Sequence, residues 1–174
     1  NRYYIRWSHQ IKTPIAALRL LLEEEEPDRA AMEGEIYRIE QYVEFALQYQ
    51  RLEGGHKDLV FAHYSLESIV KKALKKTGVL FRRTKLALEL GNLQTDVLTD
   101  EKWLVFVLEQ LLSNAVKYTA RGGVAIFWEK EKNRLVVQDT GVGIRQEDIR
   151  RVFAKGYTGT NGRMDKRATG LGLY

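Results

Sequence analysis

The spacing of apolar residues changes at Gly54–Gly55, and this change constrains the fold of the 174-residue chain more than any other feature. Before the two glycines, seam residues recur every three or four positions, which is the period of a packed helix. These seam positions are Ile11, Ile15, Leu18 and Leu22 and, after a break at Pro27–Asp28, Met32, Ile36, Ile39, Val43, Ala46 and Gln50. We therefore expect residues 1–54 to form an antiparallel hairpin of two helices.

A hairpin of two helices has a single seam and nothing to cover its other side. Two copies can bury that side together in a four-helix bundle. The sequence therefore predicts a homodimer in which residues 1–54 supply half of the bundle.

Beyond the glycines, β-forming runs alternate with two helical patterns, which predicts an α/β domain over residues 55–174. Ser65 and Asp100 are good N-caps for helices that run to about Thr77 and to Tyr118. The expected strands are 59–64, 85–90 and 93–98 around a turn at Gly91–Asn92, then 124–130 and 134–139. The expected buried side of the second helix consists of Leu104, Val107, Leu108, Leu111 and Leu112. Residues 140–172, rich in Gly, Thr and cations, have the composition of a loop.

Composition excludes several kinds of chemistry. The chain has no Cys and three His, which excludes disulfides, a thiolate nucleophile and Cys-based zinc sites. No apolar run approaches the ~20 residues of a membrane span. The net charge of +5 divides into −3 over residues 1–54, with seven Lys/Arg against ten Asp/Glu, and +8 over the remainder. That basic excess suits a phosphate-bearing small molecule as well as a nucleic acid, so charge alone does not distinguish them.

His9 falls about 150° away from the seam of the first helix, so we expect it to face outward. The residues that follow on the same face are Thr13, Ala16 and Leu20. Pro14 costs ~3 kcal/mol inside a helix and frees the carbonyl of Gln10 beside His9. An exposed neutral imidazole can attack a phosphoryl group as a nucleophile. The ordinary alternative is an exposed histidine without function.

Two further sets of residues suggest a nucleotide. Asn114 and Lys117 share a helix face, where an amide oxygen can bind Mg²⁺ and an ammonium can meet phosphate. Asp139 ends an apolar strand and can accept a hydrogen bond from the amino group of adenine. Gly141 and Gly143 permit close backbone approach of a flat ring and turns with positive φ. Each pattern also occurs at ordinary helix ends and turns.

A second glycine motif, Gly170-Leu171-Gly172, begins an apparent helix whose N-terminus suits an anion. The polar residues that precede it are Lys155, Thr158, Arg163, Lys166, Arg167 and Thr169. This loop is able to close over phosphates, although a basic loop is usually only solvated. Neither a Walker A loop nor a Rossmann fingerprint is present in the sequence.

Taken together, these motifs resemble the cytoplasmic core of a bacterial two-component sensor histidine kinase. Residues 7–14 resemble the H-box, 110–119 the N-box, 139–143 the G1 box, 152–157 the F-box and 169–173 the G2 box. The five motifs follow the family's order over nearly the whole chain. Residues 9–14 and 156–163 are most similar to intramembrane-sensing kinases that respond to cell-envelope antibiotics.

The resemblance implies an α+β fold, with the hairpin followed by an ATP-binding α/β sandwich of the GHKL type and a mixed sheet. It implies ATP and Mg²⁺ as cofactors, with Asn114 as the metal ligand and Asp139 reading adenine. The implied nucleotide-binding residues are Asn114, Lys117, Tyr118, Asp139, Gly141, Gly143, Lys155, Tyr157, Thr158, Arg163, Thr169, Gly170, Leu171 and Gly172.

The resemblance also implies that His9 accepts the phosphoryl group and passes it to an aspartate of a response regulator. Thr13 would position water for dephosphorylation of the regulator, and Ala16 and Leu20 would help to dock it. Gln10 departs from the usual Glu or Asp and cannot take up a proton, so we expect it to orient His9. The terminal helix and strand of the ATPase domain are not in the sequence.

We expect the chain to be the cytoplasmic portion of a longer bacterial membrane protein that reaches the membrane only through other segments. No nucleic-acid partner is expected. Two alternatives remain open: a GHKL-type ATPase that hydrolyses ATP to water, and a catalytically silent dimeric adaptor. The sequence does not tell which subunit's ATP would phosphorylate His9.

Overall fold

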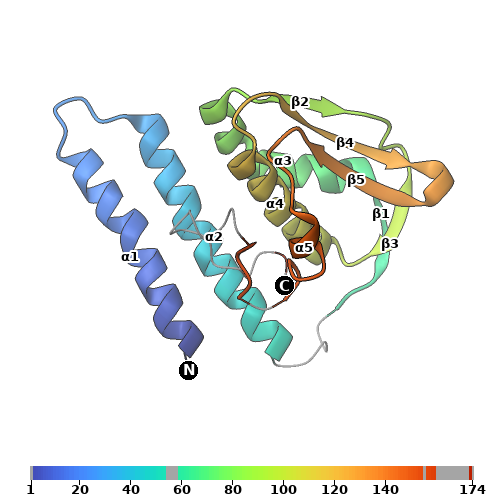
Figure 1. Cartoon of the computed structure of the whole chain (residues 1–174), viewed down its shortest axis with the longest axis horizontal. Helices are drawn as coiled ribbons and strands as arrows, with labels where there is room; N and C mark the ends of the chain where they lie inside the picture. The colour runs from blue at the N-terminus through green and yellow to red at the C-terminus, as the bar shows by residue number, and fades with distance from the viewer. Residues whose placement is uncertain (1, 54–58, 155, 160–172, 174) are drawn as a thin grey trace. The chain divides into compact units, whose positions relative to one another are not determined.

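The computed structural model describes residues 2–53, 59–154, 156–159 and 173. Of residues 2–9 and 51–53 it describes the backbone and not the side chains. The chain forms two compact units, Asn1–Leu59 and Val60–Tyr174 (Figure 1).

The first unit is a helical hairpin made of α1 (Arg2–Leu22) and α2 (Arg29–Glu53). The two helices pack side by side along their length (Figure 1). The Asp28 carboxylate accepts the N–H of Ala31 at 3.1 Å and so caps the start of α2. Helix α1 continues through Pro14. The predicted antiparallel hairpin is confirmed.

The seam of this hairpin is only partly covered by the partner helix. Ile15, Leu22, Ile36 and Val43, all expected in the seam, are 37%, 57%, 44% and 45% exposed. A single hairpin therefore leaves part of its apolar seam exposed, as the sequence analysis expects of two helices alone. In a pair of helices, each helix covers only the part of the other's apolar face that it contacts, and the rest stays exposed.

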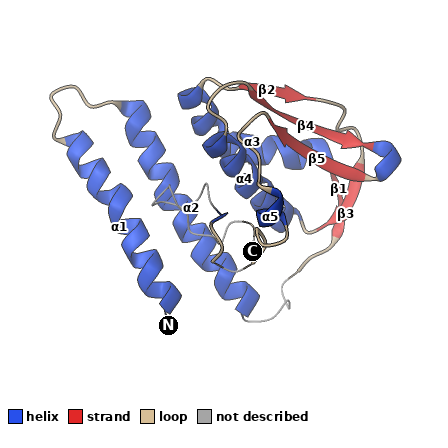
Figure 2. Ribbon diagram, viewed as in Figure 1, coloured by secondary structure: helices blue, strands red, loops and turns tan. Residues whose placement is uncertain are grey.

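The second unit contains a mixed sheet and a two-stranded ladder (Figure 2). In the ladder, β1 (Ala62–Ser65) pairs antiparallel with β3 (Asp96–Thr99). In the three-stranded sheet, β4 (Gly123–Glu129) lies between β2 (Ala87–Leu90), parallel to it, and β5 (Arg134–Asp139), antiparallel to it. The predicted mixed sheet is confirmed.

Helices α3 (Leu66–Thr84) and α4 (Glu101–Tyr118) pack together and form the helical layer beside the strands (Figure 2). Their predicted caps are present: Ser65 Oγ accepts the N–H of Ser68 at 3.4 Å, and Asp100 Oδ1 accepts that of Trp103 at 3.0 Å. The largest side chains that are fully buried are Leu66, Ile69, Val70, Thr77, Leu108, Glu109, Leu112, Val124 and Ile126. These residues form the core between helices and strands.

Both helices differ in detail from the expectation. Helix α3 runs past Thr77 to Thr84 and ends where Lys85 adopts a left-handed conformation with φ 55°. On α4, Val107 is 45% exposed, whereas Val105 and Val116 are buried. Helix α4 carries apolar residues on several of its faces, so their spacing alone does not predict which face packs against the core.

Residues 85–90 and 93–98 do not form one hairpin around Gly91–Asn92. The chain instead continues along β4, since Gly91 N–H donates to Ile126 O and Trp128 N–H donates to Asn92 O, both at 2.9 Å. A side chain at Gly91 would lie 2.6 Å from Phe127 Cβ, so glycine permits this close approach. The parallel partner of β2 is remote in sequence, which local turn signals cannot reveal.

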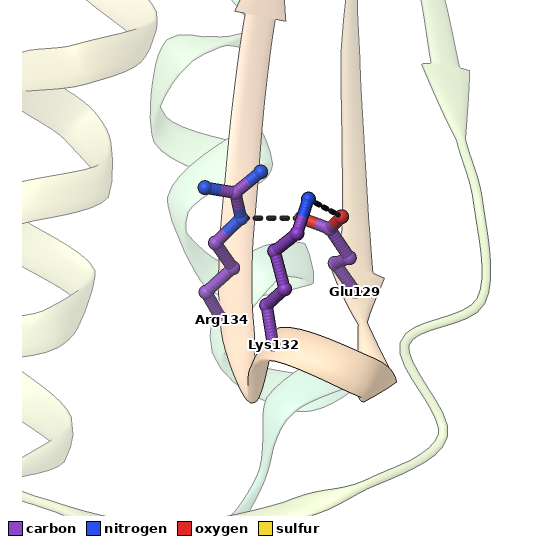
Figure 3. A network of polar contacts seen from close by, with 3 residues as sticks. All are labelled: Glu129, Lys132 and Arg134. Atoms are coloured by element: carbon purple, nitrogen blue, oxygen red, sulfur yellow. Dashed lines mark hydrogen bonds and ion pairs between the residues drawn. The ribbon is translucent and has the colours of Figure 1, made fainter.

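A short 3-10 turn, Lys130–Lys132, joins β4 to β5 and carries a small polar network (Figure 3). Lys132 Nζ donates to Glu129 Oε1 at 2.7 Å, and Arg134 Nε donates to the other oxygen of the same carboxylate. These two hydrogen bonds, that of Lys132 foremost, lower the pKa of Glu129. In the described part of the segment predicted as a loop, Gln146–Ile149 forms the short helix α5.

Candidate functional site

Two segments that the sequence analysis singled out separately meet in the second unit. The C-terminal turn of α4 ends at Tyr118, and β5 ends at Asp139. Val142 N–H donates to Tyr118 O at 3.2 Å, which joins the loop after β5 to the end of the helix. The N-box and G1-box segments are therefore neighbours in space.

Gly141 lies at the point where these segments touch. Its N–H donates to Asp139 Oδ1 at 2.8 Å. A methyl group on Gly141 would lie 2.7 Å from that oxygen and 2.8 Å from Thr119 Oγ1, and closer still to the carbonyl oxygen of Tyr118. Glycine therefore lets the two segments approach closely, and a larger residue would push them apart. The predicted approach of a flat ring to this glycine stays a prediction.

Gly143 has the positive φ that was predicted for one of the two glycines after Asp139. Its φ is +69°, a left-handed conformation that favours glycine, and a side chain there would meet no atom within 4 Å among the described residues. The loop after Asp139 thus turns away into open space. Asp139 itself is exposed, so its carboxylate is accessible to a ligand.

Thr140 joins the end of β5 to the turn that follows α4. Its Oγ1 accepts the N–H of Gly123 at 3.0 Å, and its own N–H donates to Gly123 O at 3.2 Å. Gly122 has a φ of +109°, and a side chain on it would collide with the Thr140 hydroxyl. These hydrogen bonds therefore join the residue after Asp139 to the start of β4.

The end of α4 offers three kinds of polar or aromatic contact. Asn114 and Tyr118 are half-buried, one turn apart, and Lys117 is exposed between them. Lys117 Nζ lies 5.0 Å from the centroid of the Tyr118 ring, a cation–π contact. An amide oxygen, an ammonium group and an aromatic ring therefore share the helix end that adjoins Asp139.

Thr119 is a residue of this site that the sequence analysis did not select. It is the C-cap of α4 and is 3% exposed. Its hydroxyl oxygen is buried and has no hydrogen-bond partner among the described residues. No spacing rule marks it, because a threonine after a helix end is common; its significance depends on the proximity of Gly141.

The segment after α5 is held together by its own side chains. The Tyr157 hydroxyl donates to the buried carboxylate of Asp148, and the Arg151 guanidinium lies 4.4 Å from the Tyr157 ring centroid. Thr158 is half-buried. Tyr157 is therefore bonded to α5 through Asp148. The other predicted residues of the loop, Lys155, Arg163, Thr169, Gly170, Leu171 and Gly172, lie outside the described residues.

The predicted phosphotransfer residues lie on α1 of the first unit. His9 belongs to this helix, but its side chain is outside the described part of the structure. Gln10 is half-buried, and its Oε1 has no hydrogen-bond partner among the described residues. Thr13 and Ala16 are exposed, and Leu20 is 66% exposed, as expected for an outward face.

Comparison with known proteins finds relatives of the chain. Residues 99–174 match the family model described as histidine kinase-, DNA gyrase B- and HSP90-like ATPase. The chain is 35% identical to the sensor histidine kinase YxdK of Bacillus subtilis over 99% of its own length. It is 33% identical to the sensor protein kinase GraS of Staphylococcus aureus over 95% of its length. The chain is thus similar to sensor histidine kinases along nearly its whole length.

The chain is also 33% identical to the sensor protein BceS of Bacillus subtilis over 97% of its own length. It spans about half the length of these relatives, 55% of YxdK and 49% of GraS. The structure of the Acinetobacter baumannii histidine kinase AdeS is similar, with a TM-score of 0.57 and 25% identity over 82% of this chain and 78% of AdeS. The α+β fold expected from the motifs is confirmed.

Two observations concern membranes and metals. Among the described residues of the chain, no helix is both long and apolar enough to cross a membrane. Within the same described parts, no three His, Cys, Asp or Glu side chains form a group that could hold a metal ion.

Proposed function

We propose that the chain is the core of an ATP-dependent protein-histidine kinase, with residues 1–54 as the phosphotransfer hairpin and residues 55–174 as the ATP-binding domain. The observation that carries this proposal is the close packing at Gly141, which brings Asp139 beside the end of α4. The exposed Asp139 carboxylate, set beside the end of α4, can accept a hydrogen bond from a flat base with an amino group. The family's phosphoacceptor motif on α1 supplies the other half of the reaction.

The nucleotide would be held by the residues that meet at this site. Asp139 would accept a hydrogen bond from the adenine amino group through the oxygen that Gly141 does not occupy. Tyr118 would lie against the base and Lys117 would meet a phosphate. The remaining contacts would come from Gly143, Tyr157 and Thr158 and from residues outside the described parts, Lys155, Arg163, Thr169, Gly170, Leu171 and Gly172.

Asn114 fits the metal that such a reaction requires. Mg²⁺ prefers oxygen ligands and often takes only one or two from the protein when phosphates supply the others. When bound, Mg²⁺ neutralises charge on the transferring phosphoryl group. The neutral amide of Asn114 would hold the ion, and Lys117 on the same helix end would add a second positive charge near the phosphates.

In the proposed transfer, a neutral ring nitrogen of His9 forms a bond to the γ-phosphorus as the bond from phosphorus to the β–γ bridging oxygen breaks. ADP leaves with that oxygen, and the proton on the other ring nitrogen passes to water. Gln10 cannot take up a proton, so its role would be to orient the imidazole. The phosphoryl group would then pass to an aspartate carboxylate of a response regulator.

The partners follow from α1 and α2. The exposed seam residues Ile15, Leu22, Ile36 and Val43 support a homodimer, because a second hairpin would cover them. Ala16 and Leu20 offer an apolar contact to the response regulator, and Thr13 would position water for its dephosphorylation.

We propose that the chain is the cytoplasmic part of a membrane-bound sensor, as the sensor names of its relatives suggest.

Incubation of the chain with ATP labelled at the γ-phosphate tests this function. We expect label on the protein that is labile in acid and stable in base, as a phosphoramidate is. His9→Gln should abolish the label without preventing ATP binding. The matched control is His63→Gln, an exposed histidine of β1 that should leave labelling unchanged.

The same experiment separates the two alternatives. Release of phosphate without labelled protein would identify an ATPase that transfers to water. Absence of ATP binding would identify a silent adaptor. Labelling that persists in His9→Gln would show that another residue is the acceptor.

A further inference from the structure

Helix α3 carries a formal charge as large as that of the whole chain. It contains a single acidic residue, Glu67, and six basic ones, which are Lys71, Lys72, Lys75, Lys76, Arg82 and Arg83. Six positive charges against one negative give +5, and the chain as a whole has a net charge of +5, so all other residues together sum to zero. The positive charge of the second unit is therefore gathered on this helix, where it produces a local field.

Part of this charge is used to join α3 to α4. Lys72 Nζ lies 2.5 Å from Glu101 Oε1, and Lys76 Nζ lies 2.7 Å from Oε1 of the buried Glu109. The two lysines are four residues apart and so lie on one side of the helix. This inner row of cations has its partners within the unit.

A second row of cations, Lys71, Lys75 and Arg82, faces away from the core. At about 100° per residue the three positions fall within about 40° of one another, nearly opposite the buried Ala73 and Thr77. All three residues of this outer row are exposed. The outer row is therefore accessible to a partner outside the unit.

Little acidic charge faces the outer row. Lys71 Nζ lies 2.6 Å from Oε1 of Glu67, one turn earlier on the same helix, and the two side chains are 65% and 45% exposed. An ion pair that is so exposed contributes little, so Lys71 can exchange Glu67 for another anion. No described carboxylate forms an ion pair with Lys75. The outer row therefore keeps an excess of positive charge.

The spacing of the outer row suits an anionic surface better than a single anion. From Lys71 to Arg82 the helix rises by about 16 Å, so these side chains cannot converge on one phosphate. Each Lys or Arg close to an anionic bilayer strengthens binding by about fivefold. Three such gains are weak for a freely diffusing protein and sufficient for one that is already tethered beside the bilayer.

We propose that the outer row of α3 docks on the anionic phospholipid headgroups of the membrane that holds the proposed sensor. The inference rests on one part of the proposed function, the attachment of this chain to a membrane, and not on the ATP reaction. The contact is electrostatic, because the apolar residues Ile69, Val70 and Phe81 of the same helix are buried in the core and cannot insert among the lipid tails.

Co-sedimentation with vesicles tests this docking at low ionic strength. The vesicles contain equal parts of phosphatidylglycerol and phosphatidylcholine, and pure phosphatidylcholine is the uncharged comparison. The variant Lys71→Gln/Lys75→Gln/Arg82→Gln removes three charges and should lower the partition coefficient for the mixed vesicles by between about tenfold and a hundredfold. Added salt should weaken binding of the wild-type chain, because it screens exposed charges.

The matched control removes three charges from the turn between β4 and β5 with Lys130→Gln/Lys132→Gln/Arg134→Gln. It should bind the mixed vesicles within about twofold of wild type, although its net charge equals that of the α3 variant. The α3 variant should also bind ATP and unfold thermally as the wild-type chain does, because the substituted side chains are exposed.

Three results would overturn the inference. In the first, the two triple variants lose vesicle binding equally, so that total charge and not the outer row determines it. In the second, the wild-type chain binds mixed vesicles no better than phosphatidylcholine. In the third, it binds duplex DNA more tightly than the vesicles and the α3 variant loses that binding, which would identify a nucleic-acid surface. Labelling by ATP is measured without vesicles, so a failure of the proposed kinase activity is distinguishable from each of these.

Discussion

Thr140 and Gly123 form a reciprocal pair of hydrogen bonds: the Thr140 hydroxyl accepts the Gly123 N–H at 3.0 Å, and the Thr140 N–H donates to Gly123 O at 3.2 Å. This pair holds the strand that carries Asp139 against the turn after α4. Thr140→Val removes one of the two bonds. We expect it to lower the free energy of unfolding by about 0.5–1.5 kcal/mol and to weaken ATP binding, with both effects reversed in Thr140→Ser. Equal behaviour of the Val and Ser variants would show that the hydroxyl has no such role.

Gly141→Ala tests the close contact between the two site segments. The added methyl group would collide with Tyr118 O and lie 2.7 Å from Asp139 Oδ1, so we expect ATP affinity to fall by about tenfold or more. Gly78→Ala is the matched control. Gly78 lies inside α3, where a methyl group would meet only Arg82 at 3.4 Å, and alanine there should raise stability by about 0.5–1 kcal/mol. Unimpaired ATP binding by Gly141→Ala, measured by titration, would contradict the proposed site.

Asp100 should make stability depend on pH. Burial alone would raise its pKa, but hydrogen bonds from the N–H groups of Trp103 and Val60 outweigh burial and hold the pKa below its usual value. A lowered pKa stabilises the fold above the unfolded-state value, about 3.9, and the benefit is lost as pH falls through the folded-state value.

Asp100→Asn should therefore flatten the acid limb of the stability curve and cost about 1–3 kcal/mol at neutral pH, since its NH₂ cannot accept the Val60 N–H. Chemical denaturation at several pH values measures both effects. Asp96→Asn, at an exposed position of β3, is the control. An Asp100→Asn curve parallel to wild type below pH about 4 would refute the assignment.

Leu20→Glu tests the docking of the response regulator. Leu20 is 66% exposed on α1, so a charge there should not disturb the core of the hairpin. We expect phosphotransfer to the regulator to slow by about tenfold, because a charge replaces an apolar contact at the interface. Autophosphorylation of the same preparation should be unchanged. Normal transfer rates would remove Leu20 from the docking surface.

Val43→Lys tests the homodimer. Val43 is 45% exposed in the single chain, and a second hairpin would bury it, so a charge at this position should raise the dimer dissociation constant by about tenfold or more. Glu40→Lys changes charge on the exposed polar part of the same helix and should leave the dimer intact. Sedimentation equilibrium measures both. A Val43→Lys variant as dimeric as wild type would mean that the hairpins associate elsewhere.

Local signals predicted the elements of this fold well. The caps Ser65 and Asp100, the period of α1 and α2, and the hairpin of β4 and β5 all depend on neighbouring residues, and each is present. The pairing of β2 with β4 was missed because the pairing of strands far apart in sequence leaves no mark in local spacing. Because α4 has apolar residues on several faces, the sequence did not show which face packs against the core, and Val107 was wrongly expected to be buried.

The candidate site was predictable to a similar extent. Gly141 and Gly143 were recognised because glycine reports backbone geometry directly, one by close approach and the other by positive φ. Thr119 was missed because its significance depends on an unsatisfied hydroxyl, and hydrogen-bond partners are not written in the sequence. The bond between Tyr157 and Asp148 was not predicted, because it depends on where α5 places Asp148. The nucleotide contact of Tyr157 stays a prediction.

The contact between Val60 and Asp100 sets how far the second unit can be trimmed. Val60 N–H donates to Asp100 Oδ2 at 2.8 Å, and the other oxygen of that carboxylate caps α4. An excised fragment that begins upstream of Val60 retains this amide, whereas one that begins at Ala62 leaves a buried oxygen without its donor. The smallest fragment that keeps this hydrogen bond must therefore include Val60, because its partner Asp100 lies forty residues further along the chain.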